Sequence, residues 1–240
     1  MWGRDLPGLM HLTDLLNHVL VYPDLDRVRL SSIEPWDFDP AILPLWNDSR
    51  LCRHLHIPLQ SGSDEVLKKM GRPLSRDGYL SLIQTIRETI PEAAITTDVI
   101  TGFPGETEED FEATLDLIRK IGFAGGHVFT YSPRPGTAAY KMKTTVPKSV
   151  AKARNATLRK VFIETGSKYR AQFIGEVCPV LWESSEATGD GLWQLSGLTS
   201  NYIRVYAKAE RDLWNEITFV RLLKNHPQRQ ALLGVVETVD

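Results

Sequence analysis

The chain has 240 residues, of which 42% are hydrophobic and 24% charged, with a net charge of −2, so we expect a globular protein with one substantial core and a small second domain. Its apolar runs are too short to cross a membrane and no signal-peptide pattern opens the chain, which argues against a membrane protein and for a cytoplasmic one. Two distant cysteines, Cys52 and Cys178, argue against a disulfide framework or a self-contained cysteine metal site.

Apolar runs rich in Val, Ile and Phe alternate with helical patterns over the first part of the chain. Helices are signalled by Asp39 before Pro40, and by Ser63 and Thr107 before acidic residues. Alternating strands and helices predict an α/β fold with a parallel sheet, either doubly wound or curled into a barrel, with ligands at the carboxyl ends of the strands. The predicted strands are 27–33, 54–59, 94–101 and 127–131.

Polar residues follow the first two predicted strands. Ser32 and Glu34 come after the first, where a carboxylate suits a ribose hydroxyl, although such residues also satisfy an ordinary strand exit. Gln60 and Ser61 come after the second, and an amide there suits a nucleoside or amino-acid ligand. The alternation of a strand puts His54 and His56 on one face; two imidazoles without a third ligand are more often packed residues than a metal site.

The third predicted strand runs into a glycine-rich turn over 101–107. Gly102 and Gly105 permit close backbone approach of a ligand, with Pro104 between them, but a structural strand-to-helix turn uses the same residue types. After the fourth strand, Arg134 stands between two prolines. A rigidly held guanidinium suits a carboxylate or phosphate, and a surface salt bridge is the alternative.

A basic segment separates this region from the rest. Residues 141–170 hold nine Lys and Arg against the single acidic residue Glu164. A helix over 147–173 could bury one apolar side and leave a solvated basic side, which either attracts a polyanion or is simply a solvated surface. Short alternating runs over 174–240 predict a small antiparallel β-barrel. The basic residues expected on the solvated side are Lys152, Arg154, Arg159 and Lys160.

The order and the residue sequences of these motifs resemble the methylthiotransferase branch of the radical-SAM enzymes over nearly the whole chain. The resemblance implies the later part, about four βα units, of a partial (βα)6 barrel that holds S-adenosylmethionine (1–146), a linker helix (147–173) and an RNA-binding TRAM-like barrel (174–240) that includes Gly197–Tyr202. The spellings Ser-Ile-Glu-Pro and His-Ile-Pro-Leu-Gln are similar to enzymes that add a methylthio group to C2 of N6-threonylcarbamoyladenosine in tRNA.

Site roles follow from the resemblance, and no catalytic residue or metal ligand is assigned. The residues implied to face the cofactor are Ser32, Glu34, Gln60, Ser61, Ile100, Gly102, Pro104 and Gly105. Those implied to face the substrate RNA are Arg134, Lys152, Arg154, Arg159, Lys160, Asn201 and Tyr202.

The chain departs from the family in its cysteines. Family members hold two [4Fe-4S] clusters, one through Cys-x3-Cys-x2-Cys, and neither set is present. The opening residues 2–6 resemble the segment after the family's second barrel strand, so the resemblance implies an N-terminally truncated member. We expect the chain alone to bind no cluster and to be inactive, and we expect an exposed sheet edge, partly shielded by a helix near 9–21, to favour self-association or binding of the missing half.

Two other interpretations stay open at this point. A cluster-less protein that binds RNA through its TRAM-like domain explains the missing cysteines equally well. An unrelated βα-barrel enzyme acting on a small metabolite is disfavoured, because it needs an acid/base pair that the sequence does not offer.

Overall fold

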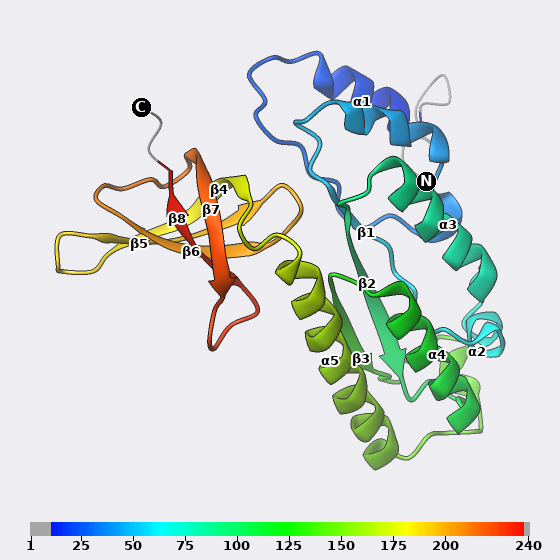
Figure 1. Ribbon diagram of the computed structural model, residues 1–240. Coiled ribbons are helices and arrows are strands. Elements are labelled where there is room, and N and C mark those ends of the chain that lie inside the picture. Colours follow the sequence, from blue (N-terminus) through cyan, green and yellow to red (C-terminus); the bar gives the residue numbers. More distant parts are fainter. Residues whose placement is uncertain (1–10, 238–240) are drawn as a thin grey trace. The chain divides into compact units, whose positions relative to one another are not determined.

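A computed structural model describes residues 11–237, and the chain divides into two compact units after Phe162. The first unit is built around a parallel sheet and the second is a closed β-barrel (Figure 1). Between residues 11 and 237, none of the helices combines the length and apolar character that a membrane span requires.

The first unit contains three strands in the order β1-β2-β3, all parallel. Its helices include three short 3₁₀ helices, η1 (Pro35–Asp37), η2 (Pro40–Asn47) and η3 (Ala139–Lys141). The strands are β1 (His54–His56), β2 (Ala94–Thr101) and β3 (Gly125–Thr130), and the α-helices are α1 (Leu12–Leu20), α2 (Asp64–Lys69), α3 (Arg76–Thr89), α4 (Glu108–Ile121) and α5 (Lys148–Ala171), the last of which continues into the second unit.

The prediction of a full strand over 27–33 is wrong. This segment forms only isolated parallel bridges, Val28 with Leu51 ahead of β1 and Ser32 with His56 of β1. Backbone hydrogen bonds hold it at its two ends, for instance from the Ile33 amide to the His56 carbonyl (3.0 Å). As an edge segment it needs partners on one side only, so two points of attachment are enough to fix it beside the sheet.

The helix starts that the sequence signals are present. Ser63 caps α2, and Thr107 forms a capping box with Asp110 at the start of α4. Asp39 also caps a helix, since its side chain accepts a hydrogen bond from the Ala41 amide, but that helix is the 3₁₀ element η2. Pro44 lies inside it and cannot donate the backbone hydrogen bond of an α-helix.

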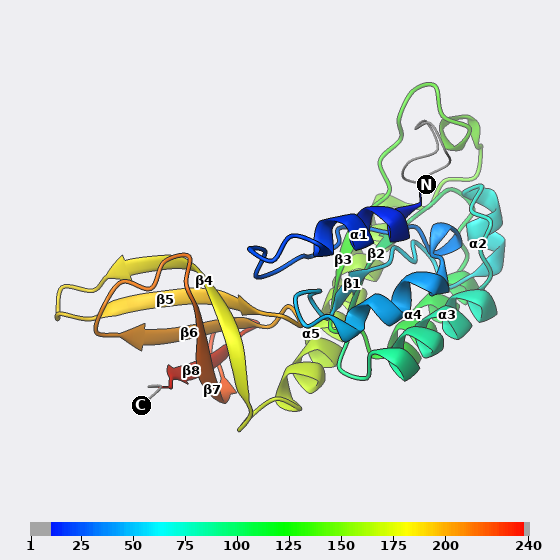
Figure 2. The same ribbon diagram turned by 90° about the horizontal axis from the view of Figure 1, so that it is seen from above.

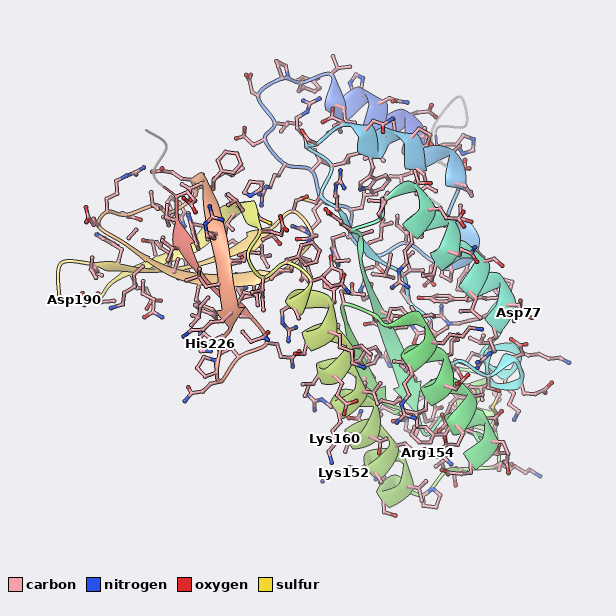
Figure 3. The ribbon with its side chains drawn as sticks, viewed as in Figure 1. Asp77, Lys152, Arg154, Lys160, Asp190 and His226 are labelled. Carbon is pink, nitrogen blue, oxygen red and sulfur yellow. The ribbon has the colours of Figure 1, made fainter. Side chains whose placement is uncertain are left out.

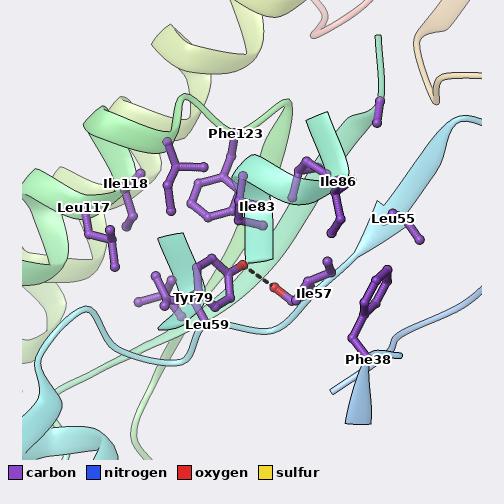
Figure 4. Packing of buried hydrophobic residues seen from close by; sticks show 14 of the residues in the cluster. Phe38, Leu55, Ile57, Leu59, Tyr79, Ile83, Ile86, Leu117, Ile118 and Phe123 are labelled. Atoms are coloured by element: carbon purple, nitrogen blue, oxygen red, sulfur yellow. Dashed lines mark hydrogen bonds between the residues drawn. The ribbon is translucent and has the colours of Figure 1, made fainter. Parts of the chain in front are cut away.

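The core of this unit lies between the sheet and its helices. Both views show α3 and α4 side by side along one face of the sheet (Figure 1 and Figure 2). Tyr79 of α3 is fully buried against Phe123, and its hydroxyl donates to the Ile57 carbonyl at 2.7 Å (Figure 4). Burial of this apolar surface is the main source of the unit's stability. The first half of α5 belongs to the same core through Leu158, Val161 and Phe162.

The second unit is a closed barrel with the strand order β4-β5-β6-β8-β7. The sequence predicts an antiparallel barrel, and every pair is antiparallel except β6 with β8. A ring with an odd number of strands cannot alternate direction throughout, so one parallel pair is required for closure. Trp182, Val205 and Leu222 fill the interior. The strands are β4 (Val177–Ala187), β5 (Trp193–Thr199), β6 (Arg204–Ala209), β7 (Ile217–Asn225) and β8 (Leu232–Val236).

Candidate functional site

Alternate residues of the parallel sheet form a polar face opposite the helix-covered face. In the strand register His56 pairs with Thr96, Asp98 with His127 and Ile100 with Phe129, and side chains paired in this way project to the same side. We use the name polar face for His54 and His56 of β1, Thr96, Asp98 and Ile100 of β2, and His127 and Phe129 of β3.

The inner end of the polar face is a hydrogen-bonded chain. Thr96 Oγ1 lies 2.9 Å from His54 Nε2 and 2.9 Å from His56 Nδ1, and His56 Nε2 lies 3.4 Å from Asp98 Oδ2. A single hydroxyl can donate to one imidazole nitrogen and accept from another, so Thr96 can bridge the two rings. The two histidines therefore bind one hydroxyl, and the arrangement orients the His56 ring toward Asp98.

His54 is held neutral by its surroundings. Its side chain is buried, and burial, together with the charges of Arg29 and His56, lowers the pKa of His54 from its usual 6.5 to about 3. A neutral imidazole at this position can donate through only one ring nitrogen, which agrees with its role in orienting Thr96. The prediction that His54 and His56 share a face is confirmed, as packed, hydrogen-bonded residues.

The outer end of the polar face is open to solvent. Phe129 is 53% exposed, and the Asp98 side chain is 26% exposed. The rings follow one another across the strands, with 6.5 Å between the centroids of His56 and His127 and 6.4 Å between those of His127 and Phe129. Sequence inspection missed Thr96, Asp98 and His127, because their proximity depends on the register of three strands.

The glycine-rich turn after β2 is filled by the protein itself. A Cβ on Gly102 would lie 2.4 Å from the Ala151 Cβ of α5, and the Gly102 amide donates to Glu106 Oε2 at 2.7 Å. The Gly105 carbonyl accepts from Lys69 Nζ at 2.9 Å. Both glycines have positive φ, and Pro104 between them is buried. The close approach at Gly102 is thus made by α5, and a cofactor role for Gly102, Pro104 and Gly105 stays a prediction.

Arg154 of α5 is buried beside this turn. The expectation that it lies on a solvated side is wrong, since its side chain is 7% exposed and pairs with Glu106 Oε2 at 2.8 Å and with Glu108 Oε2 at 2.7 Å. Burial raises the pKa of Glu106, although the Gly102 amide and Arg154 act in the opposite direction. Arg154 therefore ties α5 to the turn and to the start of α4, and it is unavailable to RNA.

The remaining residues predicted for the cofactor are dispersed around the strand ends. Ser32 is exposed, and Glu34 pairs with Arg72 at 2.8 Å. Gln60 is 8% exposed with φ +65°. Its amide donates to the Asp98 carbonyl of β2, and its carbonyl accepts from the Ile100 amide. The Ser61 hydroxyl is buried 3.3 Å from Thr114 Oγ1 of α4, so it faces the helix. Ile100 alone of these residues belongs to the polar face.

The residues predicted for RNA fall into separate groups. Lys152, Arg159 and Lys160 are exposed on α5, and Figure 3 shows Lys152 and Lys160 apart from the inward-facing Arg154. Arg134 is exposed in the loop after β3, where its carbonyl accepts hydrogen bonds from Thr137.

In the barrel, Asn201 is buried and accepts from the Thr199 hydroxyl at 2.6 Å, whereas Tyr202 is 46% exposed with φ +65°. The Arg229 guanidinium lies over the Tyr206 ring, 4.6 Å from its centroid, and its hydrogen bond lowers the pKa of Tyr206.

The cysteines do not fit the iron–sulfur cluster that the family resemblance implies. A [4Fe-4S] cluster of this kind takes three thiolates, and the chain has two cysteines. Cys52 is buried in the first unit and Cys178 lies in the second. Over residues 11–237 the side chains of His, Cys, Asp and Glu form no group of three or more that could hold a metal ion.

Comparison with known proteins adds independent evidence. Residues 6–118 match the family model of the radical SAM superfamily. The tRNA-2-methylthio-N(6)-dimethylallyladenosine synthase of Caldicellulosiruptor saccharolyticus is 41% identical over 75% of this chain and 38% of its own length. The like-named protein of Desulfitobacterium hafniense is 38% identical over 97% of this chain and 52% of its own.

A second kind of relative carries a different substrate in its name. The threonylcarbamoyladenosine tRNA methylthiotransferase MtaB of Thermotoga maritima is 39% identical over 87% of this chain and 46% of its own length. The chain thus spans about half the length, or less, of these relatives. Among solved structures, coproporphyrinogen III oxidase of Escherichia coli matches with a TM-score of 0.49 at 16% identity, over 71% of this chain and 46% of its own. By its sequence, the chain belongs to the radical-SAM methylthiotransferase family.

Proposed function

We propose that this chain takes part in the methylthiolation of tRNA, as the region of a radical-SAM enzyme that receives the modified adenosine and binds the surrounding RNA. The observation that carries the proposal is the 38% identity to a tRNA methylthiotransferase along 97% of the chain, which includes both the sheet unit and the barrel. Similarity that continues from one unit to the next favours a shared role over a shared fold alone.

For the substrate we propose an adenosine that carries a substituent on N6 and receives a methylthio group on C2. We take N6-threonylcarbamoyladenosine as the first candidate, because the spellings around Glu34 and Gln60 are similar to that subgroup. The relatives' names include both this nucleoside and the N6-dimethylallyl form. Binding of matched tRNAs that carry one or the other modification will decide between them.

For the RNA we propose that the exposed basic side of α5 contacts phosphates. Lys152 and Arg159 are seven residues apart and lie on one side of the helix, with Lys160 beside them. Replacing all three with Ala should weaken tRNA binding and reduce the slope of log affinity against log salt, by up to about 3 if each residue contacts one phosphate. A fluorescence-anisotropy titration at several salt concentrations measures both quantities.

The matched control removes three exposed basic residues of the same unit elsewhere, Lys68, Arg119 and Lys120. This control should leave both the affinity and the salt slope near the unaltered values. An equal loss in the two triple variants would mean that general positive charge, and no particular helix side, attracts the RNA.

We further propose that this chain by itself binds no [4Fe-4S] cluster and does not catalyse methylthiolation. Two cysteines in separate units cannot supply three thiolates to one cluster. Anaerobic reconstitution with iron and sulfide should leave less than one equivalent of iron per chain after desalting. Four irons per chain with the absorbance of a cluster would refute this proposal.

A cluster-less RNA-binding protein is the second candidate, and the closed barrel favours it because that unit buries its own core. The two candidates differ in their requirement for the N6 substituent. Recognition of a modified adenosine predicts tighter binding of modified than unmodified tRNA, whereas binding through the barrel alone predicts equal affinities. Self-association through the edge beside β1 and a cytoplasmic location stay predictions; sedimentation velocity of the purified chain tests the first.

A further inference from the structure

The open end of the polar face combines three kinds of group around one position. Asp98 lies on the central strand, in register with His127 of β3, and one residue pair further along Ile100 is in register with Phe129. His56 lies on the other side of Asp98, with Nε2 3.4 Å from its carboxylate. A hydrogen-bond acceptor thus stands beside two imidazole rings and an aromatic ring.

The exposure of these groups distinguishes them from a packed layer. The Phe129 ring is 53% exposed, and the carboxylate of Asp98 keeps 26% of its accessible surface. A flat apolar ring next to a carboxylate suits a planar ligand that has an apolar face and an N–H at its edge. Between residues 11 and 237, the side chains of His, Cys, Asp and Glu form no group of three that could hold a metal ion.

We propose that this end of the polar face binds the adenine ring of an N6-substituted adenosine presented by RNA, with Phe129 and His127 against the ring and Asp98 accepting the remaining N6–H. The proposal rests on the proposed function and names the residues that would recognise its substrate. RNA bases that are unstacked from their neighbours are commonly held in this manner, by aromatic stacking and hydrogen bonds at the base edge.

His56 acts in this proposal through Asp98. The hydrogen bonds of Thr96 with His54 and His56 (2.9 Å each) hold the His56 ring, whose Nε2 lies 3.4 Å from the Asp98 carboxylate. His56 is therefore a positioning residue, and Asp98, His127 and Phe129 are the proposed contacts. An ionised carboxylate accepts a hydrogen bond but donates none, so it should discriminate against purines that present an acceptor at position 6, such as inosine.

The test uses the whole chain and follows the histidine ring signals by NMR during titration with N6-dimethylallyladenosine nucleoside, adenosine and inosine. The signals of His56 and His127 should move with N6-dimethylallyladenosine and adenosine and stay in place with inosine. His226 of the barrel, whose ring lies 5.2 Å from that of Tyr206, serves as the internal control and should not move.

Two variants make the outcome specific. Asp98→Asn is isosteric and should weaken nucleoside binding about tenfold, and Phe129→Ala should weaken it about fivefold or more. Phe219→Ala removes an equally exposed phenylalanine (52%) from β7 of the barrel and should leave the affinity unchanged. Unaltered binding in both Asp98→Asn and Phe129→Ala, or equal shifts with inosine, would overturn the proposal.

Two further arms separate this proposal from its alternatives. S-adenosylmethionine also carries an adenine ring; if it moves the same signals and N6-dimethylallyladenosine does not, the face belongs to the cofactor and the proposal is wrong. Binding of tRNA is measured in parallel by anisotropy. Retained tRNA binding without nucleoside shifts refutes only the base site, whereas nucleoside shifts without any tRNA binding support the base site and refute the proposed function.

Discussion

The two faces of β2 place neighbouring residues in opposite environments. Thr97 is buried beneath the helices, where its hydroxyl donates to the Ile57 carbonyl at 2.8 Å, whereas Asp98 next to it keeps a quarter of its side-chain surface exposed. The helix-covered face and the α5 contacts hold the fold, whereas the open end of the polar face, at Asp98 and Phe129, presents groups that the fold does not require. Substitutions on the two sides should therefore separate stability from binding.

A large loss of stability is expected for Arg154→Ala. The variant leaves Glu106, whose side chain is 2% exposed, with the Gly102 amide but without its cationic partner. Removing one member of a buried ion pair costs about 3–5 kcal/mol, and the free energy of unfolding from urea denaturation measures it.

Two companion variants show whether the ion pair is the cause. Lys152→Ala, two residues earlier and exposed, should change the free energy of unfolding by less than about 0.5 kcal/mol. The double variant Glu106→Gln with Arg154→Met removes both charges and should recover much of the loss. If the double variant is as unstable as Arg154→Ala, packing rather than charge explains the effect.

Gly102→Ala should cost about 2–4 kcal/mol, the sum of a strained backbone and an overpacked contact. Gly102 has φ +76°, and a new Cβ would meet the Ala151 Cβ at 2.4 Å. Gly136 has φ +87° with no atom within 4 Å of such a Cβ, so Gly136→Ala carries the backbone strain alone, about 1–2 kcal/mol. Equal losses in the two variants would show that α5 has room to move away from the turn.

Arg154 and Gly102 show which contacts can be predicted from the sequence and which cannot. Arg154 lies four residues before Leu158 and seven before Val161, a spacing that places the three residues on one side of a helix. The spacing predicts a buried Arg154, whereas its charge favours a solvated position, and the sequence-based prediction followed the charge. The close packing around Gly102 cannot be predicted from the sequence, because its neighbour Ala151 is 49 positions away in the chain. The helix caps at Ser63 and Thr107 depend on adjacent residues and were predicted correctly.

The candidate site was harder to predict than the fold. Strand and helix order follow from local patterns, and the parallel sheet follows from their alternation. The polar face depends on which residue of β1 lies beside which residue of β2 and β3, and a shift by one residue would turn Asp98 inward. The sequence predicts that His54 and His56 share a face, because they lie on one strand. It does not predict that Thr96 and His127 lie beside them, because these residues come from other strands.

Acid should weaken the first unit through His54. Its pKa is lowered to about 3 in the folded chain from its usual 6.5, so the unfolded chain binds a proton first as pH falls. The stabilisation from neutral His54 is complete above pH 6.5 and is lost between pH 6.5 and 3, about 2 kcal/mol of it by pH 5. Urea denaturation of the unaltered chain and of His54→Gln at pH 8 and pH 5 measures the difference; equal pH dependence in both would exclude His54 as the cause.

A small effect on stability is expected for Phe129→Ala, on the open end of the polar face. Phe129 is 53% exposed, so its truncation should cost less than about 1 kcal/mol, whereas Phe123→Ala, which empties a fully buried site against Tyr79 and Phe162, should cost about 3–5 kcal/mol. Both variants replace phenylalanine with alanine, at positions six residues apart. The difference between their free energies of unfolding therefore measures the effect of burial. A large loss in Phe129→Ala would mean that its ring supports the fold, and an exposed aromatic residue that the fold does not need is the condition on which the proposed base site depends.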